Sequence, residues 1–135
     1  MRVIIAGSRT FGPRREEVMA AIDDLALGFV SEVISGCAPG VATIGEAWAT
    51  DHGIYIRRFP ADWDKHGKSA GPIRNREMAA NADALILVWD GTSHGSANMK
   101  RQALERGLVV RERVLAPLPV VSVSWSELRA KARAR

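Results

Sequence analysis

The sequence predicts an α/β fold built on a mostly parallel sheet of five strands with helices on both faces. The spacing of apolar residues changes repeatedly from short continuous runs to a helical period, which is typical of strands alternating with helices. Two runs, Val3–Ala6 and Ala84–Trp89, are apolar throughout, as expected of strands buried on both faces. Short connections between a strand and the next helix give right-handed crossovers, and therefore a doubly wound, Rossmann-like sheet.

The first half of the chain contains three of the predicted strands. The first strand is followed by a Gly-Ser-Arg turn and by a helix with apolar residues at helical spacing over 18–26. Pro13 stands where the first residue of that helix is expected. Strand Val30–Ser35 precedes an alanine-rich helix at 41–52, and Gly53 follows in the usual C-cap position. The third strand is predicted at 54–59.

The second half begins with an unusually long connection at 60–72, rich in Gly, Lys and Asp. Connections of this length are uncommon in compact domains, so we expect this one to be functional or mobile. The elements predicted after it are a helix at 73–81, the strand Ala84–Trp89, a helix at 96–106 and a fifth strand at 108–114. We assign residues 1–116 to one domain, and we include 117–135, a turn and a short basic helix, in the same domain.

The composition limits the possible classes of protein. A length of 135 residues fits one domain, and 47% hydrophobic with 25% charged residues is typical of a globular protein. No apolar run approaches the roughly 18 residues that span a bilayer, and the N-terminus fits a strand better than a signal peptide. We therefore expect a cytoplasmic protein without a membrane partner.

Cys37 is the only cysteine and the three histidines are scattered, so we expect no disulfide, metal or cofactor.

The formal net charge is +4, and much of the excess lies near the C-terminus. The basic residues crowded there are Arg129, Lys131, Arg133 and Arg135. Such a tail can contact nucleic acid, or its cations can stabilise the negative end of a helix, and the second interpretation is the simpler one. Alanine-rich helices leave apolar faces that often pair two protomers, so we also expect a homo-oligomer.

Three loops that follow predicted strands are suited to binding an anion. They are Gly7-Ser8-Arg9-Thr10, Ser35-Gly36-Cys37-Ala38-Pro39-Gly40 and Asp90-Gly91-Thr92-Ser93-His94-Gly95. Glycines let backbone amides approach an anion closely, and the following helix N-terminus adds unpaired N–H groups. Arg9 can bind a phosphate with two parallel hydrogen bonds. Because the carboxyl ends of parallel strands meet at one edge of the sheet, the loops predict a phosphate-binding site there.

The predicted helix at 73–81 places Arg74 and Asn75 in its first turn, where the helix dipole favours acidic residues. A cation such as Arg74 is favourable at this position if it binds the same anionic ligand as the three loops. The alternative is an ion pair between Arg74 and Asp90 or an aspartate of the long connection. Trp63, within that connection, can stack on a base or pack in the interior.

As a set, these motifs resemble the SLOG superfamily, a Rossmann-like group that includes the DNA-processing (Smf/DprA) proteins and the LOG phosphoribohydrolases. The strongest likeness is to its small stand-alone branch related to YspA and YpsA. The resemblance covers about residues 1–112, through Gly7-Ser8-Arg9-Thr10-Phe11, Ser35-Gly36-x-Ala38-x-Gly40, Arg57-x-Phe59-Pro60-Ala61-Asp62-Trp63, Gly71-Pro72-x-Arg74-Asn75-x-x-Met78 and Trp89-Asp90-Gly91-x-Ser93-x-Gly95. It implies binding of nucleotides or nucleotide-derived molecules such as ADP-ribose, in some members with cleavage of an N-glycosidic bond.

The resemblance also implies which residues bind the ligand. The residues expected at the phosphate and ribose are Gly7, Ser8, Arg9, Thr10, Ser35, Gly36 and Gly40. Arg74 and Asn75 are expected to add contacts from the facing helix, and the residues expected to close the site are Asp90, Gly91, Ser93 and Gly95.

The second loop departs from the family pattern Ser-Gly-Gly-Ala-x-Gly-x-Asp. Cys37 stands at the third position, and Ala42 stands where the family has its acid. The missing acid weakens an enzymatic interpretation. The spacing Gly40-x-x-Thr43-x-x-Glu46 matches a LOG motif with a catalytic glutamate, although in LOG enzymes that motif follows a later strand. Glu46 and Asp90 are therefore the candidate catalytic carboxylates.

Three functions are compatible with this sequence. The first is a binding module that senses, carries or sequesters a nucleotide or an ADP-ribose-like molecule. The second is a nucleotide N-glycoside hydrolase, with Glu46 or Asp90 stabilising the oxocarbenium-like centre and Arg74 holding the phosphate. The third is a DNA-binding protein of the DNA-processing type, using the basic tail with Arg14 and Arg15. The sequence favours the first function.

Overall fold

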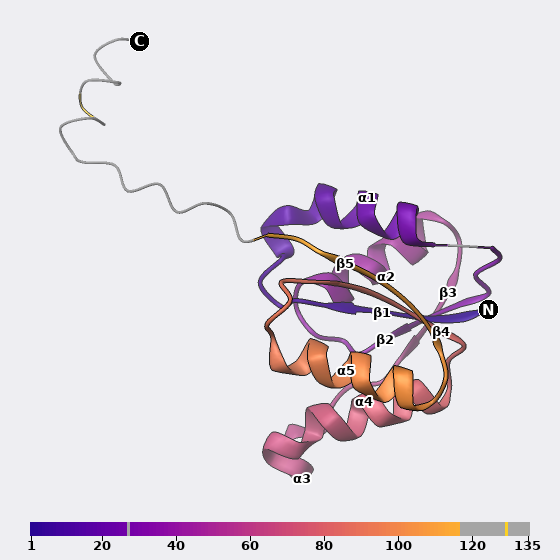
Figure 1. The fold of residues 1–135 in the computed structure, drawn as a ribbon, viewed down its shortest axis with the longest axis vertical. Coiled ribbons are helices and arrows are strands. Elements are labelled where there is room, and N and C mark those ends of the chain that lie inside the picture. Colours follow the sequence, from indigo (N-terminus) through magenta and orange to yellow (C-terminus); the bar gives the residue numbers. More distant parts are fainter. Residues whose placement is uncertain (27, 117–128, 130–135) are drawn as a thin grey trace.

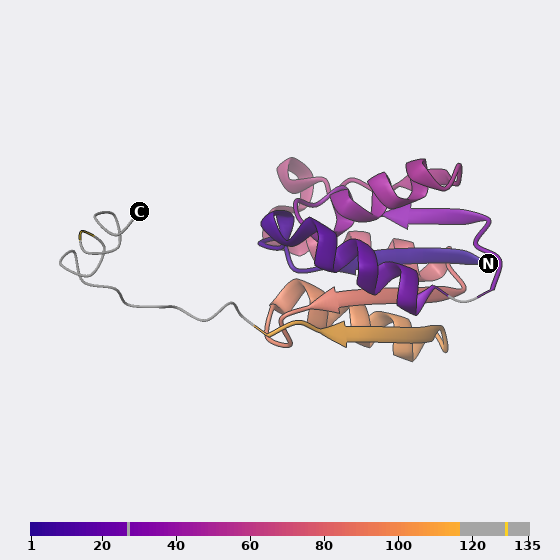
Figure 2. The same cartoon turned by 90° about the horizontal axis from the view of Figure 1, so that it is seen from above.

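A computed structural model describes residues 1–26, 28–116 and 129. Its centre is a sheet of five strands in the order β3-β2-β1-β4-β5, with every neighbouring pair parallel. The strands are β1 (Arg2–Gly7), β2 (Glu32–Ser35), β3 (Tyr55–Arg58), β4 (Ala84–Trp89) and β5 (Val109–Val114). Because every pair is parallel, the five strands end at the same edge of the sheet, to which the arrowheads of β4 and β5 point in Figure 2. The predicted Rossmann-like α/β fold class is confirmed.

Two helices cover each face of the sheet (Figure 1). On one face lie α1 (Arg15–Leu25) and α2 (Val41–Asp51), and on the other lie α4 (Ala70–Ala80) and α5 (His94–Glu105). Alternate residues of β1 enter the two cores: Val3 and Ile5 pack toward α1 and α2, whereas Ile4 packs toward α4 and α5. Because side chains alternate along a strand, a strand that is covered on both faces must be apolar at every position.

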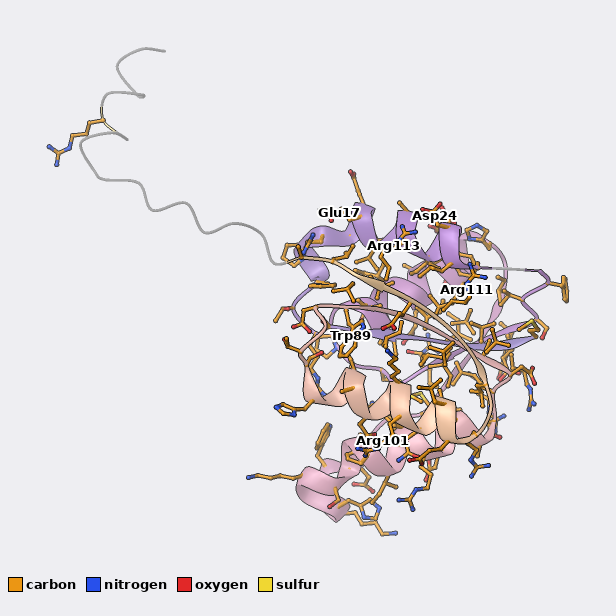
Figure 3. All side chains as sticks on the ribbon, viewed as in Figure 1. Glu17, Asp24, Trp89, Arg101, Arg111 and Arg113 are labelled. Atoms are coloured by element: carbon orange, nitrogen blue, oxygen red, sulfur yellow. The ribbon has the colours of Figure 1, made fainter. Side chains whose placement is uncertain are left out.

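The edge strand β5 is tied to its neighbours by polar contacts. Arg113 on β5 donates to Asp24 of α1 at 3.0 Å (Figure 3), and the Trp89 indole N–H donates to Glu112 at 2.9 Å. Glu112 also forms an ion pair of 2.6 Å with Lys100 of α5. These contacts hold β5 to both helix layers, although its valines 109 and 114 are about half exposed.

The structure corrects the long connection predicted at 60–72. This segment contains the short helix α3 (Trp63–His66) and a 3-10 turn, η2 (Gly67–Ser69), and α4 already begins at Ala70. Pro72 is accommodated in the first turn of α4, because N–H groups there have no intrahelical partner. Arg74 and Asn75 consequently lie in the second turn of the helix and not in the first.

Other predicted boundaries also shift. Pro13 lies in a 3-10 turn, η1 (Gly12–Arg14), which precedes α1. Helix α5 begins at His94, two residues before the predicted start. The turn and helix predicted over 117–135 lie outside the described residues, apart from Arg129. None of the helices within the described ranges is both long enough and apolar enough to span a bilayer.

The order of the strands creates a crevice between β1 and β4. From β1 the chain moves outward through β2 to β3, whereas from β4 it moves to β5 on the opposite side. The loops after β1 and β4 therefore lead to helices on opposite faces of the sheet (Figure 1). In open parallel sheets, ligands bind beyond the carboxyl ends of the strands at such a switch point.

Candidate ligand-binding site

A cavity of about 470 Å³ lies at this switch point, between the loops that follow β1 and β4. Residues of α3, α4, the start of α5 and the region around the start of α2 complete its walls. Its volume falls in the range of roughly 300–1,000 Å³ that is usual for small-molecule sites. The cavity therefore lies where ligands bind in this class of fold.

Most of the ligand-binding residues predicted from the sequence line this cavity. Those that do are Gly7, Ser8, Arg9, Thr10, Gly36, Arg74, Asn75, Asp90, Ser93 and Gly95. Ser35, Gly40 and Gly91 are not part of its lining. Gly40 has a structural role. Its φ is 78°, and it packs so closely under the first loop that a Cβ would lie 2.3 Å from the Ser8 carbonyl oxygen.

Ser8 joins the two loops that flank the switch point. It is 2% exposed, and its N–H donates to the carbonyl oxygen of Val88 on β4 at 3.2 Å. Its hydroxyl oxygen accepts the Asp90 N–H at 3.0 Å. The serine predicted to bind ligand thus also holds the β1 and β4 loops in register at the mouth of the cavity.

Asp90 is the only carboxylate among the described residues that line the cavity. Its Oδ1 accepts the N–H groups of Thr92 at 2.9 Å and Ser93 at 2.8 Å, and these bonds hold the pKa of Asp90 below its usual value. The group is therefore an anion at neutral pH, and it is poorly suited to act as a general acid. Ser93 is the N-cap residue of α5, but its hydroxyl makes no capping bond, and its Oγ is buried without a partner among the described residues.

Protonation of Asp90 is expected to destabilise the folded protein only at acidic pH. Since its pKa is lower in the folded protein than in the unfolded chain, its stabilising effect is complete above about pH 3.9 and is lost as the pH falls through the folded-state pKa. Urea unfolding of the wild type and of Asp90→Asn, from about pH 7 down to about pH 2.5, should show the stability difference shrinking below about pH 4. A stability difference between the two proteins that stays constant over this pH range would contradict a lowered pKa of Asp90.

Arg74 reaches the cavity from the second turn of α4. Its Nη1 donates to the Gly36 carbonyl oxygen at 2.5 Å and its Nε to Asn75 Oδ1 at 3.0 Å. Burial, followed by the nearby charge of Arg9, lowers the pKa of Arg74. Within the described part of the chain Arg74 forms no ion pair, so the predicted alternative of a bond to an aspartate is not what the structure has.

Asn75 links α4 to α5 next to Arg74. It is 4% exposed, and its amide nitrogen donates to the Gly95 carbonyl oxygen at 3.3 Å and to Asn98 Oδ1 at 3.0 Å. Both amide hydrogens are thus used within the protein. Asn75 thus holds Arg74 and the N-terminus of α5 in place, and its predicted contact with the ligand stays a prediction.

The rim of the cavity is cationic and its floor is apolar. Arg9, Lys68 and Arg74 all line the cavity, and the Arg9 guanidinium lies 5.6 Å from the ring centroid of Trp63, whose side chain is half exposed. The apolar lining includes Ala6, Ala38, Ala42, Met78 and Met99. Sequence reasoning missed Lys68 and Asn98, because only the unpredicted folding of α3 and η2 and the packing of α5 on α4 bring them to the site.

Glu46, the other candidate catalytic carboxylate, does not line the cavity. It accepts the Ser35 hydroxyl at 2.7 Å and forms an ion pair of 2.7 Å with Arg58 of β3. No group of three or more His, Cys, Asp or Glu side chains suited to a metal ion occurs among residues 1–26, 28–116 and 129.

Cys37 adopts a left-handed conformation, with a φ of 61°, at the position where the family pattern has glycine. Replacing it with glycine is expected to raise the free energy of unfolding by about 0.5–1 kcal/mol, because a Cβ is unfavourable in this conformation and the gain is partly offset by the greater entropy of unfolded glycine. Urea denaturation measures the change. Cys37→Ala keeps the Cβ and should leave stability nearly unchanged, so an equal gain in both variants would contradict a conformational origin.

The chain is similar to known proteins in sequence and in fold. Residues 1–66 match the model of the YspA, cpYpsA-related SLOG family. The Gene 61 protein of Mycobacterium phage D29 is 36% identical over 118 residues, which cover 81% of this chain and 93% of the phage protein. The fold resembles that of DNA processing protein A (DprA) from Streptococcus pneumoniae, with a TM-score of 0.66 and 20% identity over 82% of this chain. This chain spans about half of the DprA chain, since the match covers 49% of it. The protein is therefore a member of the YspA, cpYpsA-related family of the SLOG superfamily.

Proposed function

We propose that the protein binds a nucleotide or a nucleotide-derived molecule such as ADP-ribose in the cavity at the β1–β4 switch point. One observation carries the proposal: Arg9, Lys68 and Arg74 line the same cavity, and none of them has an ion-pair partner within the described residues. Arg74 is partly buried and the nearby charge of Arg9 also lowers its pKa, so these two cations repel, and a phosphorylated ligand supplies the missing negative charge.

The remainder of the cavity fits the other parts of such a ligand. Backbone N–H groups at the start of α5, around Gly95, have no intrahelical partners because they belong to the first turn, and they suit a phosphate. The apolar floor and the half-exposed indole of Trp63 suit the faces of a base. The Asp90 carboxylate can accept hydrogen bonds from the hydroxyl groups of a ribose.

We favour a module that senses, carries or sequesters its ligand over an enzyme. Glycoside hydrolysis usually requires two carboxylates that flank the scissile bond. Among its described lining residues this cavity contains only Asp90, since Glu46 lies outside it and Ala42 occupies the position of the family's acid. Self-association, a cytoplasmic location and DNA as an alternative ligand stay predictions.

A thermal-shift screen tests the proposal, using AMP, ADP, ADP-ribose, NAD, cyclic nucleotides, adenosine and short single-stranded DNA. At a concentration of 100 times its Kd, a ligand specific for the native state stabilises it by about 2.7 kcal/mol, which raises Tm by several degrees. We expect a shift with phosphorylated nucleotides, a weaker shift with adenosine, and ligand that chromatography recovers intact.

Three other outcomes would contradict the proposal in different ways. Release of free base would identify a hydrolase. A shift with single-stranded DNA but with no mononucleotide would favour a nucleic-acid ligand. The absence of any shift would remove the nucleotide from consideration.

A further inference from the structure

Glu46 lies outside the cavity but is connected to it through β2. Its side chain, 19% exposed, stands between two partners: Oε1 accepts the Nε–H of Arg58 at 2.8 Å, and Oε2 accepts the hydroxyl of Ser35 at 2.7 Å. Ser35, at the end of β2, is 1% exposed. Arg58 belongs to the edge strand β3, so the contacts run from the surface of the sheet toward its interior.

The Ser35 hydroxyl continues the connection to the next loop. Its oxygen accepts the N–H of Cys37 at 3.1 Å. A hydroxyl has one proton, and because that proton is donated to Glu46, a lone pair of the oxygen is left to face Cys37. The bond supports Cys37 in its left-handed conformation, which a residue with a Cβ rarely adopts without help from its surroundings.

The turn at Cys37 determines where the preceding carbonyl points. The Gly36 carbonyl oxygen accepts the Nη1–H of Arg74 at 2.5 Å, and a Cβ on Gly36 would lie 2.8 Å from that nitrogen. Any change of the turn therefore changes the position of the Arg74 guanidinium in the cavity. Contacts thus run without interruption from Glu46 through Ser35 and the turn to Arg74.

We propose that Glu46 is a positioning residue: by orienting the Ser35 hydroxyl, it holds the left-handed turn whose Gly36 carbonyl fixes Arg74 for ligand binding. The importance of Glu46 for ligand affinity rests on the proposed function, because Arg74 makes the contact with the ligand. The effect of Glu46 on the position of the Arg74 guanidinium does not depend on any ligand. The carboxylate acts within the protein and does not participate in chemistry on a substrate.

The first measurement is the rate at which the guanidinium protons of Arg74 exchange with water, followed by NMR in the ligand-free protein. Glu46→Ala is expected to raise this rate about fivefold, the effect of losing one ordinary hydrogen bond. Glu46→Gln keeps an oxygen acceptor for Ser35 and should restore most of the protection. Glu105→Ala, which removes another ion-paired glutamate from the exposed side of α5, is the matched control and should change nothing.

Cys37→Gly separates positioning from a general loss of stability. Glycine adopts the left-handed turn unaided, so Glu46→Ala should have little effect on the Arg74 exchange rate in a protein that also carries Cys37→Gly. The same pattern is expected for the Kd of ADP-ribose: about fivefold weaker binding when Cys37 is present, and nearly unchanged binding in the Cys37→Gly background. Should Glu46→Ala prove unstable, Ser35→Ala breaks the same connection.

The outcomes separate the two proposals. An exchange rate that Glu46→Ala leaves unchanged, or raises equally in both backgrounds, overturns the positioning role whether or not a nucleotide binds. If no nucleotide binds the wild type, the proposed function fails, while an exchange rate that depends on Glu46 and is rescued by glycine still supports the positioning role.

Discussion

Replacing Arg74 with methionine is expected to weaken the binding of a phosphorylated nucleotide about 30-fold. It should also lower the free energy of unfolding by about 1–3 kcal/mol, because the Gly36 carbonyl and Asn75 Oδ1 lose their donor. Hydrogen bonds to a charged group are worth roughly 1.5–3 kcal/mol, and about 1.4 kcal/mol corresponds to a factor of ten. Burial and the charge of Arg9 lower the pKa of Arg74, which means that the site disfavours the cation when no anion is present. Methionine keeps an unbranched apolar stem and removes the repulsion, which offsets part of the loss of stability.

Titration calorimetry at two salt concentrations, together with urea denaturation, measures both effects. Losing one cation should also make the affinity less sensitive to salt, because less of the binding free energy is electrostatic. Arg76→Met is the matched control: Arg76 is an exposed arginine of the same helix that does not line the cavity. Equal losses of affinity in the two variants would place the ligand elsewhere.

Replacing Gly7 with alanine is expected to have the largest effect on stability, a loss of at least about 4 kcal/mol or no folded protein. A Cβ at this position would lie 1.7 Å from the Val88 carbonyl oxygen and 2.9 Å from the Cβ of Val41. Gly7 pairs with Val88 where β1 and β4 meet at the cavity. The two strands would have to separate at their carboxyl ends, which breaks the ladder and pulls apart the loops that Ser8 joins.

Chemical denaturation of Gly7→Ala and Gly12→Ala tests this expectation. Gly12 has no atom within 4 Å of its would-be Cβ and no positive φ, so its replacement should change stability by less than about 0.5 kcal/mol. Similar stabilities for the two variants would show that β1 and β4 do not approach as closely as the structure has them.

The sheet could be predicted because its signals are local. The strand predicted at Ala84–Trp89 has the same bounds in the structure, since an uninterrupted apolar run can only be buried when both faces are covered. The start of α4 could not be predicted. Gly71 and Pro72 usually mark a loop, but the first turn of a helix tolerates proline, and the Trp63 ring packs beside Gly71, 3.4 Å from where a Cβ would be. The packing of Trp63 of α3 beside Gly71 of α4 joins separate elements and has no local pattern.

The fold class, the sheet edge that carries the cavity and the loops that flank it follow from the sequence, because strand ends and their glycine loops are local features. The role of each residue follows from the folded chain instead. Folding brings Lys68 and Asn98 to the cavity, places Gly40 beneath the first loop, and turns Glu46 toward Ser35 and Arg58. Packing between distant elements sets the direction of a side chain and the partner that it meets, and residue type and spacing along the chain do not specify either.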